Sequence, residues 1–214
     1  AHLKAASPKG IIVNAGIANA CVGEQGYKDA EEMASITANI LNAAPSEILV
    51  CSTGVIGVEL PMSIIRDGVA NINLSKDGAN QVARAMITTD TRPTELAGSC
   101  EISGKTISIG GVAKGSEMIH PNMATMLSFI TTDANVEQHF LDHCLTEVAD
   151  SSYNMLTVDG DTSTNDTVLV LANGSANNEQ ITEGPTEAEA FQPALIEVAI
   201  FLTKELARNS AYLK

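Results

Sequence analysis

The sequence predicts an α/β protein in which short strands alternate with amphipathic helices. Short apolar runs lie between turn-forming residues, and longer segments repeat apolar residues every three or four positions. The chain has 214 residues, of which 44% are hydrophobic and 18% are charged, which is enough apolar content for a sizeable core. We therefore expect one compact domain over residues 1–214.

The chain opens with a strand, a loop and a helix. Residues 10–13 form a short apolar run that reads as a strand, and the following Asn14-Ala15-Gly16 is predicted to be a loop. Residues 29–41 repeat apolar side chains at helical spacing, namely at Met33, Ile36, Ile40 and Leu41. This order is typical of an alternating α/β chain.

A second strand and two helices follow. Residues 48–51 are apolar and predict a buried strand, after which Ser52-Thr53-Gly54 is predicted to turn. A helix should begin near Pro61, because proline suits the first helical turn. Another helix is expected over 79–87.

The rest of the chain continues the alternation. Residues 100–109 predict a β-hairpin around Ser103-Gly104, and residues 126–132 predict a further strand. The helical spacing is clearest over 136–148, and a closing helix is expected over 189–206 with a strand at 168–171 before it. The polar stretch between Leu156 and Val168 is expected to be a connection.

The charge and the cysteines narrow the function classes. Twelve Lys and Arg against 26 Asp and Glu give a net charge of -14, which repels phosphate backbones and anionic membranes, so we expect no nucleic-acid or membrane partner. The four cysteines are far apart, which favours reduced thiols. No apolar run approaches the ~18 to 20 residues of a membrane span. We expect a soluble, cytoplasmic protein.

Three segments resemble known binding motifs, but each lacks the spacing or a residue that its motif requires. The run GSCEISGKT (98–106) has five residues between its glycines, where a phosphate-binding loop needs four. His139 and His143 stand four apart on a helix but lack the glutamate of a zinc-protease helix, and we expect no metal there. The run DGDTS (159–163) begins like a calcium loop, but Thr164 replaces its glycine.

Thr125 is the best candidate nucleophile. It lies between a Gly/Pro-containing approach and an apolar run, in the sequence KGSEMIHPNMATMLSFITTD (114–133). A threonine hydroxyl needs a base, and an N-terminal threonine carries one in its own α-amine, with a reference pKa of about 7.7 to 8.0. Spacing alone also fits an ordinary threonine beside a strand.

Five runs carry a family resemblance: VNAGIANAC (13–21), CSTGVIG (51–57), MITTDT (86–91), KGSEMIHPNMATML (114–127) and DGDTSTNDTV (159–168). Together they resemble the ornithine acetyltransferase family, also called glutamate N-acetyltransferase, of arginine biosynthesis. The resemblance implies the layered α/β fold of the ornithine acetyltransferase (DmpA/ArgJ-like) type. It also implies self-cleavage between Ala124 and Thr125 into chains 1–124 and 125–214 that stay associated.

The resemblance assigns roles to five residues. Thr125 matches the nucleophile that takes an acetyl group from N-acetylornithine and passes it to glutamate. Thr53 and Gly54 match the oxyanion hole, although as residues alone they fit a turn. Thr91 and Lys114 match substrate-binding positions, with Thr125 as a third.

The expected reaction needs no cofactor. Its partners are the small molecules N-acetylornithine and glutamate and the protein's own cleavage fragment, and the family resemblance adds a homo-oligomer. Whether acetyl-CoA serves as a second acetyl donor is left open. An uncut chain should be inactive, because the amine of Thr125 is then part of an amide.

The chain also departs from the family. Ile17 and Val22 stand where the family has asparagine and threonine, and the expected D-G-E-G-A-T-K motif does not follow the closing helix. Relative to the family, the sequence therefore reads as shortened at both ends. Two alternatives stay open: a noncatalytic shortened homologue, and an amidohydrolase or aminopeptidase that uses the same N-terminal threonine.

Overall fold

The computed structural model describes residues 7–120, 126–184 and 188–209. Their contacts divide the chain into two compact units, Ala1–Gly78 and Ala79–Lys214, here called the first and second units. Each is described by itself. The single domain expected over 1–214 stays a prediction.

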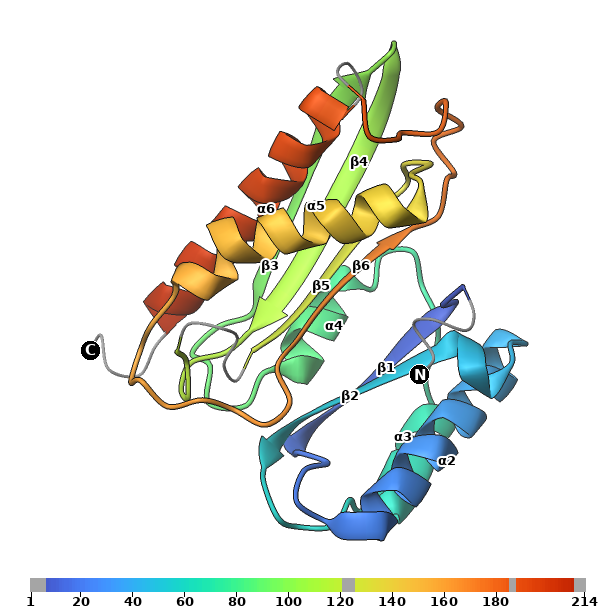
Figure 1. Cartoon of the computed structure of the whole chain (residues 1–214). Helices are drawn as coiled ribbons and strands as arrows, with labels where there is room; N and C mark the ends of the chain where they lie inside the picture. Colours follow the sequence, from blue (N-terminus) through green and yellow to red (C-terminus); the bar gives the residue numbers. More distant parts are fainter. Residues whose placement is uncertain (1–6, 121–125, 185–187, 210–214) are drawn as a thin grey trace. The chain divides into compact units, whose positions relative to one another are not determined.

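The first unit contains a parallel strand pair and two helices (Figure 1). Strand β1 (Gly10–Ile17) pairs in parallel with β2 (Ile48–Val55), and helix α2 (Gly23–Leu41) makes the crossover between them. A short 3₁₀ turn, η1 (Pro45–Glu47), leads into β2, and helix α3 (Met62–Ala70) follows it. A core of apolar side chains joins these elements, namely Ile12, Met33, Ala34, Ala38, Ile48, Leu60, Met62 and Val69.

Two local predictions in this unit are wrong. Asn14-Ala15-Gly16 and Ser52-Thr53-Gly54 were expected to be loop and turn, but both lie inside strands and pair with each other in register, from Asn14 opposite Ser52 to Gly16 opposite Gly54. Parallel pairing across the crossover overrides the local turn preference. Helix α2 begins at Gly23 rather than at residue 29. It ends at Leu41, and the next residue, Asn42, adopts a left-handed conformation (φ 50°) suited to a helix end.

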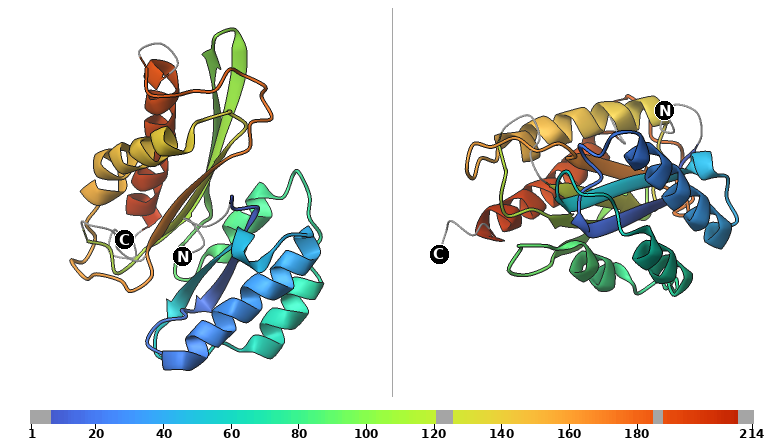
Figure 2. Two further views of the ribbon diagram at one scale, coloured as in Figure 1. Left: turned by 45° about the vertical axis from the view of Figure 1, so that its right-hand side comes forward. Right: turned by 90° about the horizontal axis from the view of Figure 1, so that it is seen from below.

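The second unit is a four-stranded sheet with helices packed on it. The strands run in the order β3 (Thr94–Ile102), β4 (Lys105–Lys114), β5 (Leu127–Thr132) and β6 (Thr167–Ala172). The first three are antiparallel neighbours, and β6 joins β5 in parallel. Helices α5 (Gln138–Ser151) and α6 (Ala188–Asn209) lie over one face of the sheet, and α4 (Ala79–Met86) lies against the other (Figure 2). A 3₁₀ turn, η2 (Tyr153–Met155), follows α5.

The core of the second unit fills the space between the sheet and helices α5 and α6. From β4 it receives Ile107, Ile109 and Ala113, and from α6 it receives Leu195, Val198, Leu202 and Leu206. The sequence predicted the hairpin, the closing helix and their apolar faces, and the structure confirms them. Helix α5 begins at Gln138 because the Glu137 carboxylate caps it, accepting the amides of His139 and Phe140.

Alternation along β4 decides where Lys114 points. Ile107, Ile109 and Ala113 face the core under α6, and successive strand residues point to opposite faces. Lys114 therefore faces away from that core, on the side of the sheet that carries α4.

None of the described helices combines the length and the apolarity that crossing a bilayer requires.

Candidate active site

The predicted site residues fall into three groups. Thr91 and Lys114 belong to the second unit, and Thr53 and Gly54 belong to the first. Ala124 and Thr125 lie outside the described residues, so the predicted cut is not itself described. The residues on either side of 121–125 are described, and they define the surroundings of the cut.

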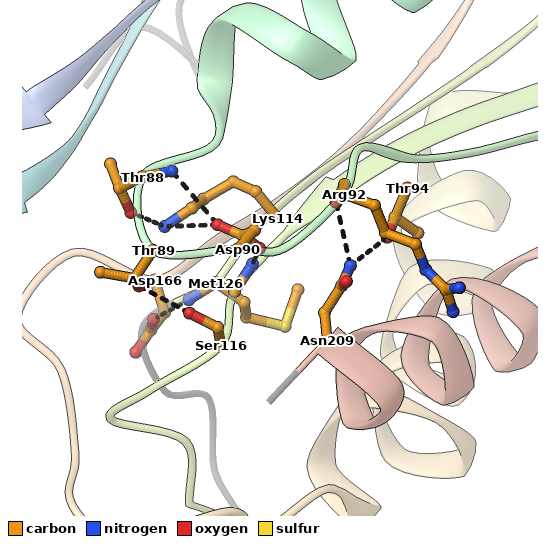
Figure 3. Close-up of polar contacts among 11 residues, drawn as sticks. Thr88, Thr89, Asp90, Arg92, Thr94, Lys114, Ser116, Met126, Asp166 and Asn209 are labelled. Atoms are coloured by element: carbon orange, nitrogen blue, oxygen red, sulfur yellow. Dashed lines mark hydrogen bonds and ion pairs between the residues drawn. The ribbon is translucent and has the colours of Figure 1, made fainter. Parts of the chain in front are cut away.

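Lys114 ends strand β4 and is nearly inaccessible, with 2% of its side chain exposed. Its Nζ donates a hydrogen bond to Thr88 Oγ1 (3.1 Å) and lies 3.9 Å from Asp90 Oδ2 (Figure 3). Burial lowers the pKa of the ammonium group, whereas the negative charges of Asp90 and Asp166 act to raise it. The ammonium group is therefore a buried charge that nearby carboxylates partly balance.

The segment after α4 is tied to the end of β4. Asp90 Oδ1 accepts the backbone N–H of Gly115 (2.7 Å), and Asp90 Oδ2 accepts that of Thr88 (3.2 Å). The hydroxyls of Thr89 and Ser116 are 2.6 Å apart and share a hydrogen bond (Figure 3). The fold thus brings together two runs of the family resemblance, MITTDT and KGSEMIHPNMATML, which are separate in the sequence.

Thr91 is held by a residue far away in the sequence. Its hydroxyl donates to Asn209 Oδ1 (2.8 Å), and Asn209 Nδ2 donates to the carbonyl of Arg92 (3.1 Å) and to Thr94 Oγ1 (2.9 Å). Asn209 is the last residue of α6 and is completely buried. One amide side chain therefore fixes both the hydroxyl of Thr91 and the start of β3.

We expect Asn209→Leu to destabilise the protein by roughly 1 to 3 kcal/mol, because leucine makes none of the three hydrogen bonds and leaves the buried hydroxyl of Thr94 without this donor. Urea unfolding measures this loss. The control is Asn80→Leu, since Asn80 is exposed and bonds only other exposed side chains in the described structure, Glu95 and Arg84. Equal losses of stability in the two variants would contradict the role given to Asn209.

Thr53 and Gly54 lie near the end of β2, opposite Ala15 and Gly16 of β1. Thr53 is 1% exposed. Gly54 has a φ of +129°, and a Cβ built on it would lie 2.2 Å from the carbonyl carbon of Gly16. Only glycine fits such a close approach of two backbones. The sequence led us to expect a turn here, and the structure instead places both residues in a closely paired strand.

Two aspartates bracket the segment 121–125. Asp159 accepts the backbone N–H groups of Met118 (2.6 Å) and Ile119 (3.1 Å), just before the segment. Asp166 Oδ1 accepts the backbone N–H of Met126 (2.6 Å), directly after it. The connection between η2 and β6, which we expected to be a plain polar loop, therefore anchors the chain on both sides of the predicted cut.

The two carboxylates differ in acidity. Desolvation acts to raise the pKa of Asp159, but the amide donors of Asp161, Met118 and Ile119 outweigh it and lower the pKa. For Asp166 burial dominates and raises the pKa to about 6, although the Met126 amide and Lys114 oppose the shift. The charge of Asp166 therefore changes near pH 6.

Sequence reasoning assigned no role to Asp90, Asp159, Asp166 or Asn209. The three aspartates lie inside the runs MITTDT and DGDTSTNDTV, so those runs contained the signal. Asn209 follows Leu206 by three positions and so shares its helix face.

In the described ranges, no group of three or more His, Cys, Asp or Glu side chains could hold a metal ion.

Comparison with known proteins gives consistent matches. A model of the ArgJ family matches residues 1–211. The arginine biosynthesis bifunctional protein ArgJ of Symbiobacterium thermophilum is 53% identical over 201 residues, covering 93% of this chain and 50% of that protein. The protein of the same name from Oceanobacillus iheyensis is 52% identical over 199 residues, covering 93% and 49%. The chain thus spans about half the length of the curated relatives it matches.

A solved structure is also similar. The crystal structure of the arginine biosynthesis bifunctional protein ArgJ from Bacillus halodurans aligns with a TM-score of 0.51 at 44% sequence identity, covering 53% of this chain and 61% of that chain. This likeness confirms the α/β fold of ArgJ-like type that the sequence predicted.

Proposed function

Because this chain belongs to the ArgJ family, we propose that it transfers the acetyl group of N2-acetylornithine to glutamate, as a step of arginine biosynthesis. One observation carries the proposal: the residues adjoining the segment 121–125 are held by two partly buried carboxylates, and the charge of the buried Lys114 acts on one of them, Asp166. Such fixed surroundings are what a nucleophile at Thr125 requires, since catalysis depends on groups placed before the reaction begins.

Before it can transfer acetyl groups, the chain must cut itself between Ala124 and Thr125. Cleavage frees the α-amine of Thr125, which then serves as the base for the hydroxyl of the same residue. The products are the chains 1–124 and 125–214, which remain together. A cytoplasmic setting and association into a homo-oligomer belong to the same proposal.

In the first half-reaction, Thr125 Oγ attacks the acetyl carbonyl carbon of N-acetylornithine while the α-amine accepts the hydroxyl proton. Thr53 and Gly54 are the proposed donors to the oxyanion. The C–N bond then breaks, the proton passes to the departing amine of ornithine, and an acetyl-threonine ester remains. Lys114 and Thr91 are the proposed contacts of the substrate.

In the second half-reaction, the amine of glutamate attacks the ester carbonyl. The C–O bond to Thr125 breaks, N-acetylglutamate leaves, and the hydroxyl of Thr125 is restored. Because one product leaves before the second substrate enters, the kinetics should be ping-pong. Water must be excluded, or the ester is hydrolysed and the protein acts as a deacetylase.

The test combines mass and kinetics. Intact-mass measurement of the purified protein should give two chains that meet at Ala124/Thr125, and N-acetylornithine with glutamate should give N-acetylglutamate with parallel double-reciprocal plots. Ornithine release at the same rate without glutamate would instead favour the amidohydrolase. A single uncut mass with no turnover would favour the noncatalytic homologue. Replacing N-acetylornithine by acetyl-CoA tests for a second acetyl donor.

A further inference from the structure

We propose that Asp166 is a positioning residue for Thr125, because its carboxylate accepts the backbone N–H of Met126, the residue that directly follows Thr125. The inference rests on the proposed function, in which Thr125 is the nucleophile, and it names a residue to which the family resemblance gave no role.

Met126 is held at both of its backbone polar groups. Its N–H donates to Asp166 Oδ1 (2.6 Å), and its carbonyl accepts the N–H of Thr167 (3.1 Å). Asp166, just before β6, and Thr167, its first residue, thus both bind Met126, which directly precedes β5 and is itself buried. The backbone of Met126 is therefore held by a side chain as well as by a backbone hydrogen bond.

Charged and polar side chains from three segments act on the carboxylate of Asp166 or on its neighbour Lys114. Lys114 pairs with Leu127 in the β4–β5 ladder, and its positive charge acts on Asp166. Asp90 acts on Lys114 from the segment after α4, and Ser163 donates to Asp166 from the same loop. An ionised acceptor makes a stronger hydrogen bond to an amide than a neutral one does, and here the nearby cation supports the ionised form. Figure 3 shows Asp166, Met126 and Lys114 in this arrangement.

Protonation should weaken this anchor. Because burial raises the pKa of Asp166 to about 6, its carboxylate is charged above that pH and neutral below it. The α-amine of Thr125, with a reference pKa of about 7.7 to 8.0, must also be neutral to act as a base. The logarithm of kcat/KM should therefore rise with a slope of one up to the pKa of the amine. Protonated Asp166 still offers a carbonyl oxygen to the Met126 amide, so its neutralisation should add only a step of at most about threefold near pH 6.

Two substitutions separate the hydrogen bond from the charge. Asp166→Ala removes the acceptor, so we expect self-cleavage and kcat to fall roughly 10- to 100-fold with KM nearly unchanged. Asp166→Asn keeps a carbonyl oxygen that can accept the Met126 amide. We expect it to retain activity within about threefold at pH 8, and the added step near pH 6 should be absent from its pH profile.

The matched control is Asp161→Ala, which removes an exposed carboxylate from the same loop. A readout independent of activity is hydrogen exchange at the Met126 amide. Exchange should accelerate in Asp166→Ala and stay unchanged in Asp161→Ala. This measurement also serves if Asp166→Ala is too slow to assay.

The inference is overturned if Asp166→Ala exchanges and reacts as Asp161→Ala does, or if Asp166→Asn is as slow as Asp166→Ala. Failure of the proposed function looks different, because the unsubstituted protein would then neither cut itself nor transfer acetyl groups, whereas exchange at Met126 would still respond to Asp166.

Discussion

We expect Thr125→Ala to give a single uncut chain that transfers no acetyl group. The substitution removes the hydroxyl that we propose to attack in both cleavage and transfer, and without the cut the α-amine remains part of an amide. Loss of a nucleophile commonly lowers kcat by on the order of 10⁴-fold or more. Intact-mass spectrometry and an assay for N-acetylglutamate measure the two effects in one preparation.

Two further variants sharpen this test. Thr125→Ser keeps a hydroxyl and should still cut itself and transfer acetyl groups, though at altered rates. Thr131→Ala removes the hydroxyl of an exposed residue in the same strand, β5, and should leave both activities intact. Normal cleavage by Thr125→Ala, or measurable transfer by it, would show that another residue is the nucleophile.

Gly54→Ala should destabilise the first unit by more than about 4 kcal/mol. An added Cβ would lie 2.2 Å from the carbonyl carbon of Gly16, 2.3 Å from its oxygen and 2.6 Å from the nitrogen of Ile17. All three atoms belong to the backbone of β1, so relief requires the two strands to move apart. The φ of +129° is also a conformation that alanine strongly disfavours.

Gly57→Ala is the matched control. Gly57 also has a positive φ, +79°, but nothing lies within 4 Å of the Cβ that alanine would add. Its cost should be limited to backbone strain, roughly 1 to 2 kcal/mol. Thermal unfolding of both variants measures the difference. If they melt at the same temperature, close approach of β1 and β2 is not what requires glycine at Gly54.

The sequence correctly predicted those helices and turns that depend on residues close together in the chain. The hairpin of β3 and β4 turns at Ser103-Gly104, where both residues have positive φ, and a Ser-Gly pair favours this turn. Helix α6 was predicted from its repeating apolar face. In contrast, the ends of β1 and β2 were misread as turns, because glycine punctuates loops more often than strands. Their true state depends on pairing across a helix, which no short window of sequence contains.

In the candidate site, too, the contacts that the sequence did not predict join residues far apart in the chain. The family resemblance pointed to Lys114 and Thr91, and the structure adds the groups that hold them. Asp166 contacts Met126 across 40 residues of sequence, and Asn209 contacts Thr91 across 118. Spacing rules describe neighbours on one helix or strand, so they cannot reveal such partners. The runs that carried the resemblance contained three of the four missed residues without indicating what they bind.

The proposed cut falls between β4 and β5, two strands that pair with each other in the sheet. Six residue pairs, from Ile109 opposite Thr132 to Lys114 opposite Leu127, then join two different polypeptides. Strands β3 and β4 come from one product, whereas β5, β6, α5 and α6 come from the other, so the sheet and its core become an intermolecular interface. The two products would then depend on each other for this core, and their refolding after separation would be second order in concentration. Folding as one chain must come first, and cleavage makes that order irreversible.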